Sequence, residues 1–177
     1  LVVDADANSN LNEVLGVEVD TTLGTIREEM ANAELKGTIP SGMTKADYAE
    51  FKFNSALVEE DDFDMLVMGR TQGKGCYCYV NGVLQSQVAK YASNYSYVVM
   101  DNEAGLEHVA RGTLPKVDTM LLISDCSRRG IQAAARVAEI VAEMELNPAQ
   151  MGLIVNRAPE GKLDDGVMEE IEKHGLK

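Results

Sequence analysis

The amino-acid sequence predicts an α/β fold, in which a doubly wound and mainly parallel sheet carries helices on both faces. Short apolar runs alternate along the 177 residues with stretches of helical composition, and this order gives right-handed βαβ units. The runs are apolar at successive positions, as in strands that are buried on both faces. The length suits one hydrophobic core, so residues 1–177 are expected to form a single domain.

The expected elements follow from local composition, periodicity and breakers. Apolar runs predict strands at residues 1–3, 63–68, 97–100, 120–123 and 153–155. Composition and helical spacing predict helices at residues 22–35, 44–59, 84–95, 103–111, 131–145 and 164–174. The breakers Gly37, Pro40 and Gly42 separate the first two helices, and Gly175 ends the last one. Residues 70–81, which contain glycines and two cysteines, are expected to form a loop.

Both ends of the sequence are expected to be truncations of a larger domain. The apolar residues 1–3 run directly into Asp4 without a preceding turn, so the chain is expected to begin inside a strand. A doubly wound domain normally returns to its sheet after a helix such as 164–174. We therefore expect a missing N-terminal strand, loop and helix, and a missing C-terminal return to the sheet.

The charge balance narrows the classes of partner. Sixteen basic and twenty-nine acidic residues give a net charge of −13, which would repel a nucleic-acid backbone. No apolar run approaches the roughly 20 residues that span a bilayer, and no signal peptide opens the sequence. We therefore expect a cytoplasmic protein with no membrane or nucleic-acid partner. Three cysteines do not make a disulfide framework, so free thiols or a metal site are expected.

Polar segments directly follow the predicted strands. These segments are residues 4–10, 70–78, 101–105, 125–129 and 156–159. In open parallel sheets, ligands bind at the carboxyl ends of the strands. The five segments are therefore expected to share the edge of the sheet that binds a ligand.

Two of these segments carry carboxylates. Asp4 and Asp6 are two residues apart, so in an extended chain only one of them easily faces a ligand. The alternative for this segment is an acidic turn whose side chains bond local backbone groups. Asp101 follows an apolar run and precedes Gly105, an arrangement that suits a magnesium-bound water beside a phosphate. The alternative for Asp101 is a helix N-cap, and both roles are compatible.

The third segment is Asn156-Arg157, in which an amide side chain at a strand end could bind the edge of a purine. Taken alone, it is an ordinary strand-to-turn sequence. Taken together, however, the three segments resemble the MinD/ParA/nitrogenase-iron-protein class of deviant-Walker ATPases, which are P-loop NTPases of SIMIBI type. The resemblance covers nearly the whole chain, and the three loops occur in the right order.

The resemblance implies a role for each matching residue. Asp6 matches the switch I aspartate that positions the attacking water, and Asp101 matches the catalytic aspartate of switch II. The implied cofactor-binding residues are Asp4, Gly105, Asn156 and Arg157. The implied cofactors are ATP and Mg²⁺, and the implied assembly is a homodimer.

One element of that class is absent from the sequence. No G-x-x-x-x-G-K-[ST] phosphate loop precedes Asp6, and Gly73-Lys74-Gly75 lies too far downstream and lacks this spacing. We therefore expect the 177-residue chain to be inactive on its own, and the complete protein to bind and hydrolyse ATP.

The segment 69–81 resembles the Cys-x-Cys loop of CooC-type accessory proteins, which insert nickel into carbon-monoxide dehydrogenase, and residues 125–130 are similar to the same subfamily. Cys76 and Cys78 cannot complete a tetrahedral site alone, but the same pair from a second subunit would give four sulfur ligands for Ni²⁺ or Zn²⁺. The alternative is two inert loop cysteines. Cys126 has no thiol neighbour in sequence and is expected to be a packing residue near the nucleotide.

Three functions are consistent with these patterns. The leading one is an ATP-dependent metallochaperone that serves carbon-monoxide dehydrogenase, with hydrolysis coupled to rearrangement of the dimer and its metal site. The second is a MinD/ParA-type positioning ATPase that acts on a membrane or on DNA, in which the cysteines are incidental. The third is a passive metal-binding module without catalysis.

Overall fold

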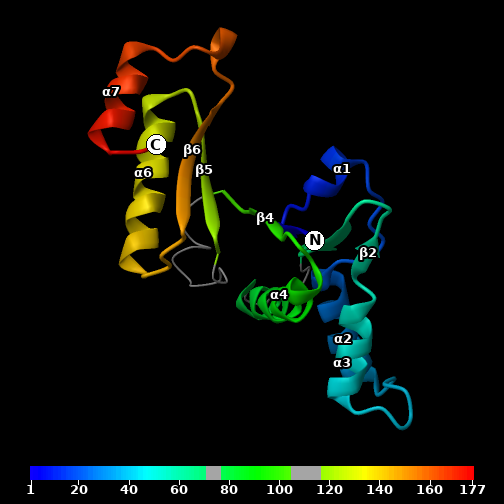
Figure 1. The fold of residues 1–177 in the computed structure, drawn as a ribbon. Helices are drawn as coiled ribbons and strands as arrows, with labels where there is room; N and C mark the ends of the chain where they lie inside the picture. The colour runs from blue at the N-terminus through cyan, green and yellow to red at the C-terminus, as the bar shows by residue number, and fades with distance from the viewer. Residues whose placement is uncertain (71–76, 105–116) are drawn as a thin grey trace. The chain divides into compact units, whose positions relative to one another are not determined.

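The structure, a computed structural model, describes residues 1–70, 77–104 and 117–177, and for residues 77–79 the backbone only. The chain divides into two compact units, Leu1–Ala104 and Gly105–Lys177. Each unit has its own sheet, with four described strands in the first and two in the second (Figure 1). Among the described residues, no helix has the length and apolar character needed to cross a membrane.

The first unit alternates strands and helices. Its elements are β1 (Val2–Ala5), α1 (Leu11–Leu15), α2 (Leu23–Lys36), α3 (Lys45–Asn54), β2 (Leu57–Glu59), β3 (Asp64–Val67), α4 (Tyr77–Tyr91), the 3-10 helix η1 (Ala92–Asn94) and β4 (Val99–Asn102). The strand order is β2-β3-β1-β4. β1 runs parallel to β3 and β4, and β2 is antiparallel to β3. The predicted mainly parallel sheet is confirmed.

The core of the first unit has two parts, one on each face of the sheet. Helices α2, α3 and α4 cover one face, where the buried side chains include Val3, Ile26, Phe53, Leu66, Leu84 and Val88. On the other face, Met65 and Val67 pack against Val17, with Leu11 beside them. Full burial of a large aliphatic side chain contributes about 1.5–3 kcal/mol, so these two layers dominate the stability of the unit.

Helix α2 begins at a capping box and ends at a left-handed glycine. Thr22 accepts a hydrogen bond from the Thr25 N–H, Thr25 bonds back to the Thr22 N–H, and Gly37 has φ 64°. The predicted helix 22–35 is confirmed. Its first turn lies against the end of β3, where the Gly24 N–H donates to the Met68 carbonyl at 2.8 Å. A Cβ on Gly24 would lie 2.4 Å from the Arg70 carbonyl oxygen, so only glycine fits.

Three expectations for the first unit need correction. The helix predicted at 44–59 ends at Asn54, because residues 57–59 pair with β3, and a three-residue strand has too short a pattern to be recognised. The loop predicted at 70–81 is shorter, because α4 already begins at Tyr77. The strand predicted at 97–100 was expected to be buried, but Tyr97 and Val99 are 82% and 62% exposed. β4 is the edge strand of the described sheet, so one side of it has no neighbour.

The described part of the second unit contains two parallel strands and two main helices. Its elements are β5 (Thr119–Asp125), α6 (Arg128–Glu143), β6 (Gln150–Asn156), the 3-10 helix η2 (Pro159–Gly161) and α7 (Asp165–Lys173). These confirm the strands predicted at 120–123 and 153–155 and the helices predicted at 131–145 and 164–174. α6 begins one turn earlier than expected because Ser127 caps it, accepting from the Gly130 N–H at 3.0 Å. The helix predicted at 103–111 lies mostly outside the described residues.

Only one face of the β5–β6 pair is covered by described residues of the second unit. Leu122 is buried together with Ile131 of α6, whereas Leu121 and Ile123 are 57% and 61% exposed. These side chains alternate along β5 because successive residues of a strand point to opposite faces. The expectation that β5 is buried on both faces is therefore wrong for the described part of this unit.

Helix α7 is joined to α6 through a largely buried carboxylate. Glu170 Oε1 accepts hydrogen bonds from Lys173 Nζ at 3.0 Å, from Gln132 Nε2 of α6 at 3.1 Å, and lies 3.0 Å from His174 Nε2. The bond from Lys173, followed by the bond from Gln132, lowers the pKa of Glu170 to about 2. The ionised form of Glu170 is thus the form that the folded unit stabilises.

Replacement of Gly24 by Ala should destabilise the first unit by about 1–3 kcal/mol, because the new methyl group meets backbone atoms of Arg70. The matched control is Gly82→Ala on α4, where a Cβ would meet no atom within 4 Å. That control should be neutral or stabilise by up to about 1 kcal/mol. Urea unfolding of both variants measures the difference, and equal effects of the two substitutions would contradict the close approach.

The Glu170→Gln variant should be less stable than the wild type at neutral pH, and this difference should depend on pH. The folded-state pKa of about 2 lies below the ordinary glutamate pKa of 4.5, so the stabilisation is full above about pH 4.5 and is lost as the pH falls toward 2. Unfolding midpoints between pH 7 and pH 2 test this, with the exposed Glu169→Gln as control. A difference that stays constant over this range would show that ionisation of Glu170 is not its cause.

Candidate functional site

The carboxyl ends of β1 and β4 bring three predicted site residues into one region of the first unit. Asp4 of β1 is in register with Asp101 of β4 on the adjacent parallel strand, and Asp6 follows two residues after Asp4. Partial burial, and then the like charges of Asp4 and Asp6, raise the pKa of the Asp101 carboxyl. These carboxylates therefore repel one another electrostatically, and a bound cation would relieve that repulsion.

Asp4 is fully buried, and backbone N–H groups engage both of its carboxylate oxygens. Oδ1 accepts from the Asp6 N–H at 3.0 Å, and Oδ2 accepts from the Leu11 N–H at 3.1 Å. The second bond satisfies the first turn of α1, whose N-cap Asn10 makes no side-chain capping bond. Asp4 thus determines how the chain leaves the sheet, which is the turn chemistry named above as the alternative for this segment.

The Asp6 loop is held together by further local bonds. Asp6 Oδ1 accepts from the Asn8 N–H at 2.7 Å, and the Asp6 carbonyl accepts from the Ser9 N–H at 3.2 Å and from Ser9 Oγ at 3.1 Å. Ser9 has φ 49°, an unusual value for a residue other than glycine. The side chain of Asn8 in turn accepts a hydrogen bond from the Arg70 guanidinium. The loop that carries Asp6 is therefore defined by hydrogen bonds on both of its sides.

The predicted metal ligands and switch II glycine are not located by the structure. Cys76 and Gly105 lie outside the described residues, and Cys78 lies in the first turn of α4, where only its backbone is described. Among the described residues, no group of three or more histidine, cysteine or acidic side chains is arranged to hold a metal ion. These positions remain predictions.

Three polar residues of the first unit make contacts or are buried in a way that the sequence did not predict. Asn8 and Arg70 bond to each other although 62 positions separate them. Asn81, one turn after Cys78 on α4, is 3% exposed, and neither polar atom of its amide has a hydrogen-bond partner among the described residues. The position of Arg70 directly after β3 was the signal available in the sequence. No sequence signal marked Asn81, because the burial of its side chain depends on how α4 packs.

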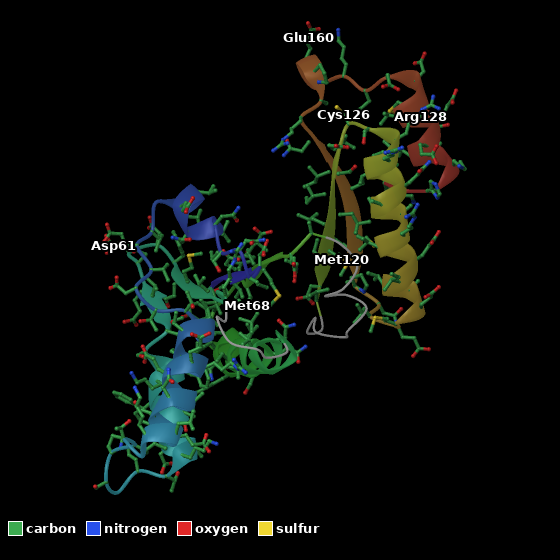
Figure 2. The ribbon with its side chains drawn as sticks, turned by 180° about the vertical axis from the view of Figure 1, so that it is seen from behind. Asp61, Met68, Met120, Cys126, Arg128 and Glu160 are labelled. Atoms are coloured by element: carbon green, nitrogen blue, oxygen red, sulfur yellow. The ribbon has the colours of Figure 1, made fainter. Side chains whose placement is uncertain are left out.

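In the second unit, the ends of β5 and β6 are joined by hydrogen bonds. Asn156 is in register with Asp125, its Oδ1 accepts from the Arg157 N–H at 2.8 Å, and the Arg157 carbonyl accepts from Cys126 Sγ at 3.3 Å. Cys126 is half-buried and lies at the same end of this unit as Arg128 (Figure 2). Because Asn156 Oδ1 accepts the Arg157 N–H, the amide nitrogen of Asn156 is the group that could donate to a base.

The loop before α6 is fixed by Asp125. Its Oδ1 accepts from Ser127 Oγ at 2.6 Å and from the Ser127 N–H at 3.0 Å, and these bonds, together with the charge of Arg157, lower the pKa of Asp125. A Cβ on Gly130 would lie 2.3 Å from the same oxygen, so glycine is required there. These bonds fix the chain between the end of β5 and the start of α6.

The comparisons with known proteins point to ATP-binding relatives. No protein-family model matches the sequence. An uncharacterized ATP-binding protein of Methanocaldococcus jannaschii is 46% identical over 157 residues, which cover 89% of this chain and 62% of the relative. The carbon monoxide dehydrogenase accessory protein CooC of Rhodospirillum rubrum is 24% identical over 181 residues, covering 89% of this chain and 68% of that protein. The chain thus spans about three-fifths to two-thirds of the length of these relatives.

A third relative and two solved structures extend the comparison. The maintenance of carboxysome distribution protein A of Gloeothece citriformis is 25% identical over 161 residues, covering 90% of this chain and 58% of that protein. MinD in the MinC:MinD complex of Aquifex aeolicus matches with a TM-score of 0.59 at 19% identity, over 99% of this chain and 65% of that chain. Apo McdA of Cyanthece matches with a TM-score of 0.60 at 17% identity, over 98% and 67%. This chain therefore shares the α/β fold of these two structures, and its relatives in sequence include proteins named as ATP-binding proteins and the accessory protein CooC.

Proposed function

We propose that this chain is the larger part of an ATPase that acts as a homodimer and serves as a metallochaperone for nickel insertion into carbon-monoxide dehydrogenase. The observation that carries the ATPase part is the position of Asp6 and Asp101 at the ends of adjacent parallel strands. The carboxylates are in the region where sheets of this kind bind phosphate-bearing ligands. The printed names of the relatives support ATP as that ligand.

The residues present fit a magnesium ion. Carboxylate oxygens are the ligands that Mg²⁺ prefers, and the ion usually binds one or two carboxylates together with substrate phosphates. The oxygens of Asp4 are engaged by backbone N–H groups, so Asp101 is the carboxylate that would hold the ion. Partial burial, and then the negative charges of Asp4 and Asp6, raise the pKa of Asp101, and a bound cation would favour its ionised form. Bound Mg²⁺ would neutralise the phosphate charge.

The chemistry of the remaining site residues suits particular roles in binding and hydrolysing ATP. The free oxygen of Asp6 can accept a hydrogen bond from a water molecule and orient it for attack on a phosphoryl group. The backbone of Gly105 can approach a terminal phosphate because it carries no side chain. In the second unit, the amide nitrogen of Asn156 can donate to the base, and Arg157 follows it. A lysine-containing phosphate loop, which these 177 residues do not include, would complete the cradle.

Asp101→Asn and Asp6→Asn should each lower ATP turnover by roughly a hundredfold in a longer form of the protein that includes such a loop. Each change keeps the shape of the side chain and removes its negative charge, so ATP should still bind. Steady-state hydrolysis and isothermal titration measure the two effects separately. The control is Asp61→Asn, which removes the same charge from the turn before β3, at the opposite edge of the sheet. Wild-type turnover in both site variants would exclude this assignment.

The metallochaperone part rests on Cys76 and Cys78 and on the similarity to CooC. Two thiolates from one segment leave at least two positions of a tetrahedral site open. A two-fold dimer presents the same segment from each subunit, so two copies supply four sulfur ligands for Zn²⁺ or for nickel as cargo. ATP hydrolysis would then rearrange the dimer and release the metal to the dehydrogenase.

Zn²⁺ should bind at one ion per two chains, promote dimers and release protons from the thiols. Changing both Cys76 and Cys78 to Ser should abolish metal-dependent dimerisation and leave ATP binding largely unchanged. Cys126→Ser is the matched control, because Cys126 bonds to the Arg157 carbonyl in the second unit. Sedimentation during a zinc titration decides the question. One ion per monomer, or dimers that persist with chelator in the double-serine variant, would rule out the shared site.

A MinD/ParA-type positioning ATPase is the second candidate. It is favoured by the similarity to the carboxysome distribution protein and by the shared fold with MinD and McdA. In that case ATP alone should drive dimerisation, and the double-serine variant should behave as the wild type in every metal and dimer measurement. The zinc titration therefore separates the two candidates.

A further inference from the structure

We infer that Arg70 is a positioning residue for Asp6 and acts on it through the side chain of Asn8. The inference rests on the proposed function, because it assigns Asp6 the role of orienting the attacking water. Four residues form a continuous series of hydrogen bonds, in which Asp4 bonds to Asp6, Asp6 to Asn8, and Asn8 to Arg70. The series joins the loop after β1 to the loop after β3.

The first end of the series is fixed by the sheet. Asp4 pairs in register with both Val67 and Asp101, its carbonyl accepts from the Met68 N–H at 2.9 Å, and its side chain is fully buried. Its carboxylate therefore holds the Asp6 N–H at a defined place. This bond sets where the loop begins, and the bonds from Asn8 and Ser9 to Asp6 then shape its outward half.

The other end of the series is fixed by helix α2. The Arg70 carbonyl lies so close to Gly24 that a Cβ there would be 2.4 Å away, and a Cβ on Gly69 would be 2.1 Å from Thr22 Oγ1. Gly69 also has φ 69°, which a side chain would disfavour. The backbone of Arg70 is therefore held against the first turn of α2, and its side chain is the part that reaches across to Asn8.

The link between the two fixed ends passes through Asn8. Its backbone N–H donates to Asp6 Oδ1 at 2.7 Å, while its side-chain oxygen accepts from Arg70. A guanidinium donor makes this a charge-assisted bond, which is stronger than a bond between neutral groups. Both sides of the loop are thereby tied to rigid elements. One oxygen of Asp6 is used by the loop itself, so the orientation of the other follows from where Asn8 is held.

Stability does not account for this bond. Asn8 and Arg70 are both exposed, and exposed polar pairs contribute little to folding. The Asn8–Arg70 bond matters instead for the position of Asp6. A catalytic group that is displaced by about 1 Å can lose a large part of its effect on the reaction rate. Arg70 also places a positive charge beside a loop whose neighbours Asp4 and Asp101 are acidic.

The test compares Arg70→Ala, Asn8→Ala and the double variant in the ATP-hydrolysing longer form. Each single variant should lower kcat roughly tenfold, with less than about a twofold change in KM for ATP, because binding does not use this bond. The double variant should be no slower than either single variant, because both remove the same link. Asn8→Asp should restore most of the rate, since a carboxylate accepts from the guanidinium as well.

A second readout does not depend on hydrolysis. In the 177-residue chain, Arg70→Ala should speed hydrogen exchange of the amides of residues 6–10 while leaving those of β3 unchanged. Unaltered exchange, additive losses in the double variant, or an Asn8→Asp variant as slow as Asn8→Ala would each overturn the inference. An inactive wild type would defeat the proposed function and the inference with it. If the wild type hydrolyses ATP, Asp6→Asn lowers kcat and Arg70→Ala keeps the wild-type kcat, the inference is overturned but the proposed function is not.

Discussion

The pairing of β1 between β3 and β4 is the constraint on which the first unit depends. Parallel pairing places the carboxyl ends of all three strands at one edge, so Asp4 lies level with Val67 on one side and Asp101 on the other. The same strand supplies Val3 and Ala5 to the core under α2 and α4. One set of ladder hydrogen bonds therefore determines both the packing of the core and the grouping of the carboxylates.

Grouping these carboxylates has an energetic cost that the local structure only partly offsets. Burying an ionised carboxylate is unfavourable unless hydrogen bonds compensate it, and Asp4 receives two backbone N–H groups. Among the described residues no donor compensates Asp101 in this way, and its pKa is raised by partial burial and by its acidic neighbours. Stored electrostatic repulsion of this kind is characteristic of sites that bind cations or perform catalysis. The stability of the unit comes from elsewhere, mainly from the two apolar layers.

In the second unit, a different set of hydrogen bonds fixes the chain where it leaves the ends of the strands. Asp125 organises the start of α6 through Ser127, and Cys126 donates to the carbonyl of Arg157. The buried carboxylate of Glu170 then joins α7 to α6. In both units an acidic side chain accepts backbone or side-chain donors at the point where the chain changes direction. The strongly acidic composition is thus partly structural, and not only a property of the surface.

The sequence by itself determined the elements whose signals are local. Helical composition and the glycines that follow it predicted α2 and α7, and an apolar run predicted β3. The order of loops and strands was enough to select Asp4, Asp6 and Asp101, because parallel strands bring their carboxyl ends to one edge. Only the tertiary structure decided that β2 is a strand and that β4 is an exposed edge, since strand pairing and burial depend on neighbours. It alone brought Asn8 to Arg70, because no local pattern encodes a bond between residues 62 positions apart.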